Sequence, residues 1–156
     1  MRNSFRTAET IIVFICIVGF AGRLMHYAFT EYFIIVGFLS LAFFYLLIGT
    51  QNRAQFPKKL KAFPDITMNT WEGLALLVSG EGVAVSMIGI LFYFLNWEGS
   101  GIMLMVGGLA GLMGLLAQVL YLRLRQPEIY TFFVYRLITI TVICGYLLYK
   151  SGVIFN

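Results

Sequence analysis

Charged residues are scarce in this chain of 156 residues. Asp, Glu, Lys and Arg together make up 12% of it, whereas an ordinary soluble domain carries about 25%. Proline is also rare, with three residues, while hydrophobic residues make up 60%. Such a chain has too little polar surface to cover a water-facing globule. The composition therefore predicts a protein that lies in a lipid bilayer, and it does not favour a nucleic-acid partner.

The residue types used in metal and redox chemistry are equally sparse. The chain has two cysteines, Cys16 and Cys144, both inside apolar runs, and its single histidine is His26. No Cys-x-x-Cys pair and no Ser-His-Asp set at comparable depth is present, and no Asp-rich motif could hold magnesium against a lipid phosphate. We therefore expect no metal, no cofactor and no disulfide framework, and a protein that is not an enzyme.

Long apolar runs predict an all-α polytopic membrane bundle of five transmembrane helices, over about 11–28, 32–48, 81–97, 101–122 and 129–149. The stretch from Trp71 to Trp97 would be about 40 Å long as one helix, which exceeds the roughly 30 Å hydrocarbon layer. We expect a break at Ser79–Gly82, so that the third helix starts near Glu81 and 71–78 lies at the interface. The single membrane domain, 1–156, then divides into hairpin 11–48, loop and interfacial segment 49–80, hairpin 81–122 and helix 129–149.

The basic residues predict the orientation of these helices. Of the Lys and Arg residues outside the predicted helices, eight lie on one side of the membrane and only Lys150 lies on the other. The eight are Arg2, Arg6, Arg53, Lys58, Lys59, Lys61, Arg123 and Arg125. By the positive-inside rule, the N-terminus and the long loop face the cytoplasm of a bacterial inner membrane, and the C-terminus lies outside. The run Lys58, Lys59 and Lys61 could also attract anionic lipid headgroups, although topology accounts for it equally well.

Shifting the sequence by 70 residues aligns the first hairpin with the second without a gap. Gly19 then meets Gly89, and Gly37 meets Gly107. Polar and small residues on one helix face also correspond: Cys16, Gly19, Arg23 and His26 with Ser86, Gly89, Tyr93 and Asn96. The pattern predicts a parallel repeat of two hairpins, followed by one further helix.

Arg23 and Arg136 are the only formal charges that we place inside the predicted helices, where a charge costs about 2.5 to 3.5 kcal/mol. Arg23 could extend to the headgroups, pair with Glu31 or Glu98, or line an ion path. With His26, Tyr93 and Asn96 it forms a candidate intramembrane polar site. His26 is either an interfacial residue or a proton carrier, and the nearby cation opposes its protonation.

Two further sets of residues are candidates for helix packing. Arg136 and Glu81 are predicted at similar depth, and we expect an ion pair that docks the fifth helix on the second hairpin, with extension of Arg136 to the headgroups as the alternative. The fourth helix presents a stripe of small residues with one polar group at its end, namely Gly107, Gly111, Gly114 and Gln118. Such a stripe lets helices approach closely, within the chain or with a partner.

Two motifs carry a family resemblance. The segment Gly89-Ile90-Leu91-Phe92-Tyr93-Phe94-Leu95-Asn96-Trp97, followed by Gly101-Ile102-Met103-Leu104-Met105-Val106-Gly107, resembles the membrane hairpin of GldL, the motor subunit of Bacteroidetes gliding and type IX secretion. Arg23-Leu24-Met25-His26-Tyr27 is similar to that family's Lys-x-x-His-aromatic motif. The resemblance covers the two hairpins and implies a shared hairpin fold.

The chain also departs from that family. Proton-driven work in the family is associated with a glutamate on the second helix of the hairpin, and neither 32–48 nor 101–122 contains Asp or Glu. We therefore expect a non-catalytic subunit or scaffold, with a membrane-protein partner or a second copy of itself. The alternatives are a proton- or ion-conducting motor component and, third, a lipid-modifying enzyme.

Overall fold

The computed structural model describes residues 3–27, 30–50, 70–122 and 127–151, and within these ranges it contains helices and turns but no strand. Its elements are α1 (Asn3–Leu24), α2 (Thr30–Thr50), α3 (Thr70–Phe94), α4 (Ser100–Ala117), the π-helical turn η2 (Gln118–Leu122) and α5 (Pro127–Lys150). Five helices of the described residues are long and apolar enough to cross a membrane. The predicted all-helical class with five such helices is confirmed.

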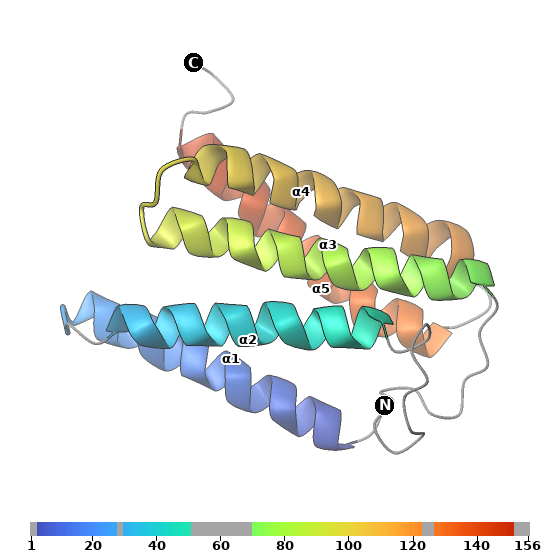
Figure 1. Ribbon diagram of the computed structural model, residues 1–156, viewed down its shortest axis with the longest axis horizontal. Helices are drawn as coiled ribbons and strands as arrows, with labels where there is room; N and C mark the ends of the chain where they lie inside the picture. The colour runs from blue at the N-terminus through green and yellow to red at the C-terminus, as the bar shows by residue number, and fades with distance from the viewer. Residues whose placement is uncertain (1–2, 28–29, 51–69, 123–126, 152–156) are drawn as a thin grey trace.

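Two antiparallel hairpins lie side by side, and the fifth helix lies behind them (Figure 1). The first hairpin is α1 with α2, and the second is α3 with α4. The central helix is α3, which packs on α2, α4 and α5. In contrast, the backbone of α1 lies close to that of α2 alone, while α5 packs on the second hairpin. The backbones of α1 and α5 therefore do not meet, and only side chains can join the first helix to the last.

Helix α3 is continuous where the sequence predicted a break. It runs without interruption from Thr70 to Phe94, so the predicted break at Ser79–Gly82 and the predicted start near Glu81 are wrong. The small residues of 79–82 serve packing instead. A Cβ atom on Gly80 would lie 2.6 Å from the carbonyl oxygen of Tyr45 on α2, and one on Gly82 would lie 2.6 Å from that of Ala110 on α4. Close approach on two sides explains these glycines inside a helix.

The first helix also differs from its predicted range. It begins at Asn3 rather than near residue 11, and it ends at Leu24 rather than Ala28. The polar residues before Ile11 therefore form its first turns. As a result Glu9 lies within an apolar helix, so Arg23 and Arg136 are not the only charged residues inside the five long helices.

Both hairpin turns begin with the same helix cap. His26 and Asn96 adopt the left-handed conformation, with φ of 60° and 52°. The Tyr27 amide donates a 3.1 Å hydrogen bond to the carbonyl of Gly22, and the Trp97 amide donates one of equal length to the carbonyl five residues before it. This is the Schellman arrangement, which satisfies carbonyl groups at a helix end. Asn and His adopt its left-handed position more readily than most residues.

Within each hairpin the helices cross at glycines. A Cβ atom on any of these glycines would lie within 3.3 Å of a residue on the neighbouring helix. The four contacts form two pairs separated by 70 residues: Gly19 with Ile34, Gly89 with Leu104, Gly37 with Cys16, and Gly107 with Ser86. The two hairpins therefore share their turn geometry and their points of closest approach.

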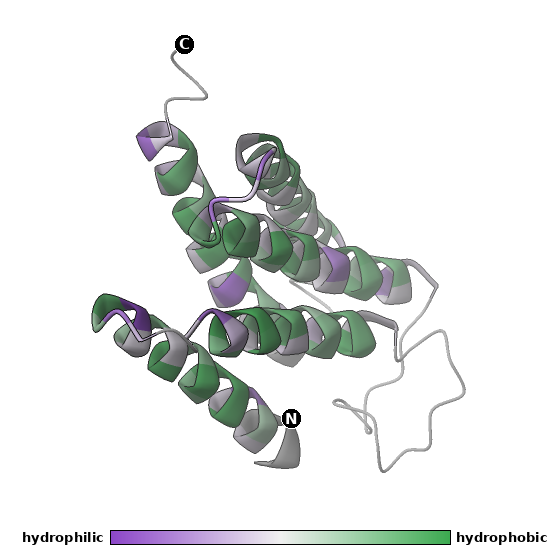
Figure 2. Ribbon diagram, turned by 60° about the vertical axis from the view of Figure 1, so that its left-hand side comes forward, coloured by the Kyte–Doolittle hydropathy of each residue, from purple (hydrophilic) through white to green (hydrophobic). Residues whose placement is uncertain are grey.

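Apolar side chains cover much of the outer surface. In Figure 2 hydrophobic residues dominate the helical ribbons. On α4 four large side chains are between 61% and 69% exposed, namely Ile102, Leu109, Met113 and Leu116. Soluble monomers rarely expose an apolar surface of this extent.

Candidate functional site

Three polar side chains from three helices meet inside the bundle. Glu9 comes from α1, Tyr45 from α2 and Arg136 from α5, and we call them the charge cluster. Arg136 Nη2 donates to Glu9 Oε2 at 2.6 Å, and Arg136 Nε donates to Glu9 Oε1 at 2.7 Å. The Tyr45 hydroxyl donates to Glu9 Oε1 and lies 2.7 Å from Arg136 Nε. The carboxylate therefore receives two parallel bonds from the guanidinium, the strongest geometry for such a pair.

The guanidinium of Arg136 is held from a further side. Its Nη1 donates to the carbonyl oxygen of Phe132 at 2.6 Å, and its Cζ lies 3.9 Å from the centre of the Phe132 ring. A cation over an aromatic face gains electrostatic attraction. The side chain of Arg136 is 29% exposed and that of Glu9 13%. The pair is therefore largely removed from solvent and lies among apolar neighbours.

The predicted pair between Arg136 and Glu81 is wrong. Glu81 is exposed on α3, and Arg136 binds Glu9 instead. The prediction failed because we began the first helix at Ile11 and so left Glu9 outside it. One signal could have found this residue: Glu9 lies seven residues before Cys16, two helical turns back along the face that carries Cys16, Gly19 and Arg23.

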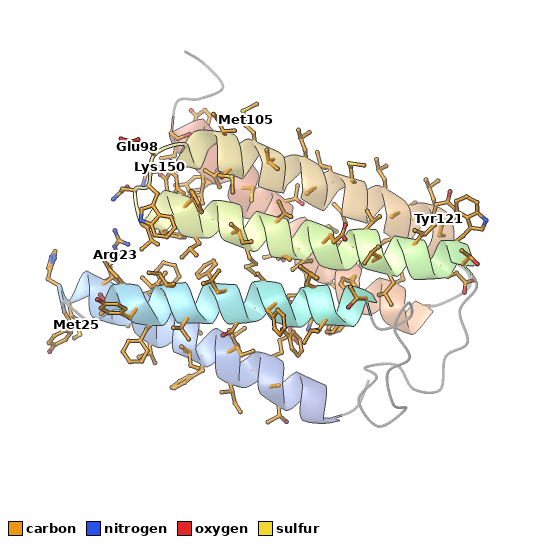
Figure 3. The ribbon with its side chains drawn as sticks, in the orientation of Figure 1. Arg23, Met25, Glu98, Met105, Tyr121 and Lys150 are labelled. Carbon is orange, nitrogen blue, oxygen red and sulfur yellow. The ribbon has the colours of Figure 1, made fainter. Side chains whose placement is uncertain are left out.

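The predicted polar site at the other end of the helices is not a connected cluster. His26 and Asn96 are exposed at the two turns, and no side-chain hydrogen bond joins any two of Arg23, His26, Tyr93 and Asn96. Arg23 has no ion pair with Glu31 or Glu98 among the described residues, and its Nη1 is buried without a hydrogen-bond partner there. Figure 3 shows Arg23 and Met25 at the same end of the bundle as Glu98 and Lys150, with Tyr121 at the opposite end.

The small-residue stripe of α4 faces the interior. Gly107, Gly111 and Gly114 are buried, and Gly111 faces Thr141 of α5 while Gly114 lies between α3 and α5. Gln118 is fully buried, and its Nε2 donates a 2.8 Å hydrogen bond to Ser79 Oγ on α3. The stripe therefore packs α4 within the chain, and its polar end ties α4 to α3.

Two other predictions concern ligands. Lys58, Lys59 and Lys61, the candidate headgroup residues, lie outside the described residues. Within the described ranges, no group of three or more His, Cys, Asp or Glu side chains is placed to hold a metal ion. The charge cluster itself is a carboxylate that accepts hydrogen bonds from a guanidinium and a phenol.

A cavity lies beside the charge cluster, between α1 and α5. Its volume is about 260 Å³, and it opens on the surface of the bundle. The charge cluster forms its polar side. Apolar side chains from four helices line the rest, including Val13 of α1, Leu41 of α2, Met87 of α3 and Ile140 of α5. We call it the α1–α5 groove.

Comparisons with protein-family models, with curated proteins and with solved structures gave no match to this chain.

Proposed function

We propose that this chain is an integral protein of a bacterial inner membrane and serves as a non-catalytic subunit or scaffold of a membrane complex. The observation that carries the proposal is the distribution of polarity. Large apolar side chains face outward along all five helices, while the three groups of the charge cluster bond to one another inside the bundle. In a bilayer, apolar surfaces contact lipid and polar groups must find partners within the protein.

The charge cluster suits a structural role in such a protein. An unpaired charge at the centre of a transmembrane helix costs about 2.5 to 3.5 kcal/mol. Here the positive charge of Arg136 faces the negative charge of Glu9, and Tyr45 adds a hydrogen bond. The cluster thus fixes the first hairpin against the fifth helix, which is what a scaffold of defined shape needs.

We further propose that the two hairpins arose by duplication and that their kinship is with the hairpin of GldL. The support is the correspondence at 70 residues of the turn caps and the glycine crossings. The two caps, at His26 and at Asn96, lie within the segments 23–27 and 89–97 that resemble GldL. In this arrangement both hairpins run in the same direction, the N-terminus is cytoplasmic and the C-terminus lies outside, and the partner is a membrane protein or a second copy of the chain.

The membrane location and the orientation can be tested in cells. We expect the protein to remain in the membrane pellet after extraction with sodium carbonate. A cysteine introduced at Glu98 or Ser151 should react with a membrane-impermeant maleimide from outside, whereas one introduced at Lys59 should react only after lysis. Recovery in the soluble fraction, or the reverse labelling pattern, would contradict the proposal.

The charge cluster also supports a second candidate, a proton-conducting component of a membrane motor. Glu9 is a protonatable group within an apolar helix, and the α1–α5 groove opens beside it. The double substitution Glu9→Leu with Arg136→Met distinguishes the two functions. A scaffold keeps its partners and its cellular role when both charges are replaced together. A proton carrier keeps its assembly but loses its role, because the carboxylate of Glu9 that would carry the proton is gone.

The scaffold role itself is tested by mild-detergent purification and identification of the chains that co-purify. We expect a defined membrane-protein partner, or a self-association that survives dilution, with the wild-type chain and with the doubly substituted chain. A monodisperse monomer without partners would overturn the scaffold role.

A further inference from the structure

The N-terminal half of α1 is packed much more loosely than the matching part of the second hairpin. We call residues 7–15 the α1 arm. None of the side chains in the arm is buried, and five of them are exposed. In the equivalent stretch of α3, residues 77–85, five residues are buried and one is exposed. The two hairpins therefore differ in this half, although they share their turns and their glycine crossings.

The other half of α1 is fixed to the bundle at the helix crossing. Cys16 and Gly19 are buried, and a Cβ atom on Gly19 would lie 2.9 Å from Ile34 of α2. Phe20 packs edge-on against Phe94 of α3, with ring centres 4.6 Å apart. From this crossing α1 and α2 diverge toward the N-terminus of α1 (Figure 1). The crossing is therefore a fixed point about which the arm can tilt.

The charge cluster holds the arm at its other end. Glu9 accepts two hydrogen bonds from the Arg136 guanidinium and one from the Tyr45 hydroxyl. Without Glu9, Arg136 would keep the Tyr45 hydroxyl and both the carbonyl and the ring of Phe132 as partners. Loss of the pair therefore leaves α2 and α5 in place, and the arm is the part that can move.

Lipid lowers the cost of such a movement. In a bilayer, helices gain little from burying apolar surface against each other, because lipid tails are as apolar as the side chains. The exposed side chains of the arm, such as Ile11 and Phe14, can contact lipid whether or not the arm lies against α2. The movement thus depends on the proposed membrane location, since in water the apolar side chains would hold the arm to α2.

We propose that the α1 arm is a hinged segment, which the Glu9–Arg136 pair holds closed and which tilts away from α2 when the pair is broken. The hinge is the crossing at Gly19. Such a segment gives a protein with the proposed scaffold role one movable part, while the second hairpin and α5 keep their shape. Ile11 lies about 12 Å along the helix from Gly19, so a tilt of about 25° would move it by roughly 5 Å.

The first test measures distances between pairs of spin labels in lipid vesicles. Each label is carried by a genetically encoded ketone residue, so that the native cysteines are retained. One pair replaces Ile11 and Leu116 of α4, and the other replaces Ile17 and Ile102 of α4; all four side chains are exposed. In Glu9→Gln we expect the first distance to grow by roughly 5 Å and the second to stay as in the unsubstituted chain.

Ser79→Ala is the matched control for this test. Ser79 lies 70 residues after Glu9 in the sequence and accepts a hydrogen bond from Gln118 of α4. Its part of α3 packs on α2 and on α4, so both distances should stay unchanged. An unchanged first distance in Glu9→Gln would overturn the proposal. Equal changes of the two distances would overturn it as well, because they would mean that α1 moves as a whole.

The second test uses the wild-type chain and does not depend on the folding of a variant. In detergent micelles, the backbone amides of the arm should exchange with deuterium at least roughly tenfold faster than those of 77–85. Equal protection of the two stretches would overturn the proposal.

Carbonate extraction of the vesicles separates a failure of the hinge from a failure of the proposed location. Protein that leaves the membrane would contradict the location. Protein that stays in the membrane, with an unchanged first distance in Glu9→Gln, would contradict only the hinge.

Discussion

Arg136 on the last helix and Glu9 on the first form a two-bond ion pair across 127 residues of chain, with nitrogen to oxygen distances of 2.6 and 2.7 Å. The pair joins α1 to α5, whose backbones do not meet. Tyr45 of α2 bonds to both partners and so brings the second helix into the same cluster. Three helices that are distant in sequence are therefore tied together at a single point.

Removal of one charge from this pair should destabilise the protein by about 3 kcal/mol, because the other charge is left without a counter-charge among apolar neighbours. We expect this loss for Glu9→Gln and for Arg136→Met. The double variant Glu9→Leu with Arg136→Met should recover most of it. The measurement is unfolding by SDS in mixed micelles, followed by circular dichroism.

Glu81 provides a matched control for this prediction. It is a glutamate on a neighbouring helix, but it is exposed and takes no part in the pair. Glu81→Gln should therefore change the free energy of unfolding by less than about 0.5 kcal/mol. If Glu81→Gln cost as much as Glu9→Gln, or if the losses at Glu9 and Arg136 were simply additive, the observed pairing would be contradicted.

The hydroxyl of Tyr45 should contribute measurably to stability. Its loss in Tyr45→Phe removes hydrogen bonds to two charged groups, and we expect a cost of about 1 to 2 kcal/mol. Tyr93→Phe is the control, since among the described residues the Tyr93 hydroxyl makes no hydrogen bond. The same micelle titration compares them, and equal effects would count against a role for the Tyr45 hydroxyl.

The glycine crossings should be sensitive to a single methyl group. A Cβ atom on Gly89 would lie 2.5 Å from the carbonyl oxygen of Met103, so Gly89→Ala must push α3 and α4 apart, at a cost of about 1 to 3 kcal/mol. Gly145 on α5 has nothing within 4 Å of such an atom. Gly145→Ala should instead stabilise its helix by about 0.5 to 1 kcal/mol. Opposite signs in the free energies of unfolding are the result that we expect.

His26 should contribute through its backbone conformation, as a helix cap. Its φ of 60° suits glycine, so His26→Gly should be neutral or stabilising by up to about 1 kcal/mol. The β-branched variant His26→Val should destabilise by about 1 to 2 kcal/mol. We expect the cellular role to follow stability in both variants. Loss of the role in a His26→Gly protein of normal stability would show that the imidazole itself is required.

The sequence was sufficient for some of these features and insufficient for others. The glycines at 19, 37, 89 and 107 could be recognised as equivalent because a helix crossing needs a missing side chain at fixed positions. Glu9 could not be assigned to Arg136 from the sequence. A charged residue just before an apolar run gives the same sequence pattern whether it precedes the helix or lies within its first turns. The glycines of 79–82 were misinterpreted for a similar reason: a helix break and a close crossing both need small residues.

Composition and the spacing of apolar runs determined that the chain forms five long apolar helices, because each such run has to satisfy its backbone within itself, whatever its neighbours. The tertiary structure alone decided which charges meet, where α3 begins and which space is left between α1 and α5. These features depend on the tilt and rotation of each helix against the others, and such angles result from the sum of many side-chain contacts rather than from any local pattern.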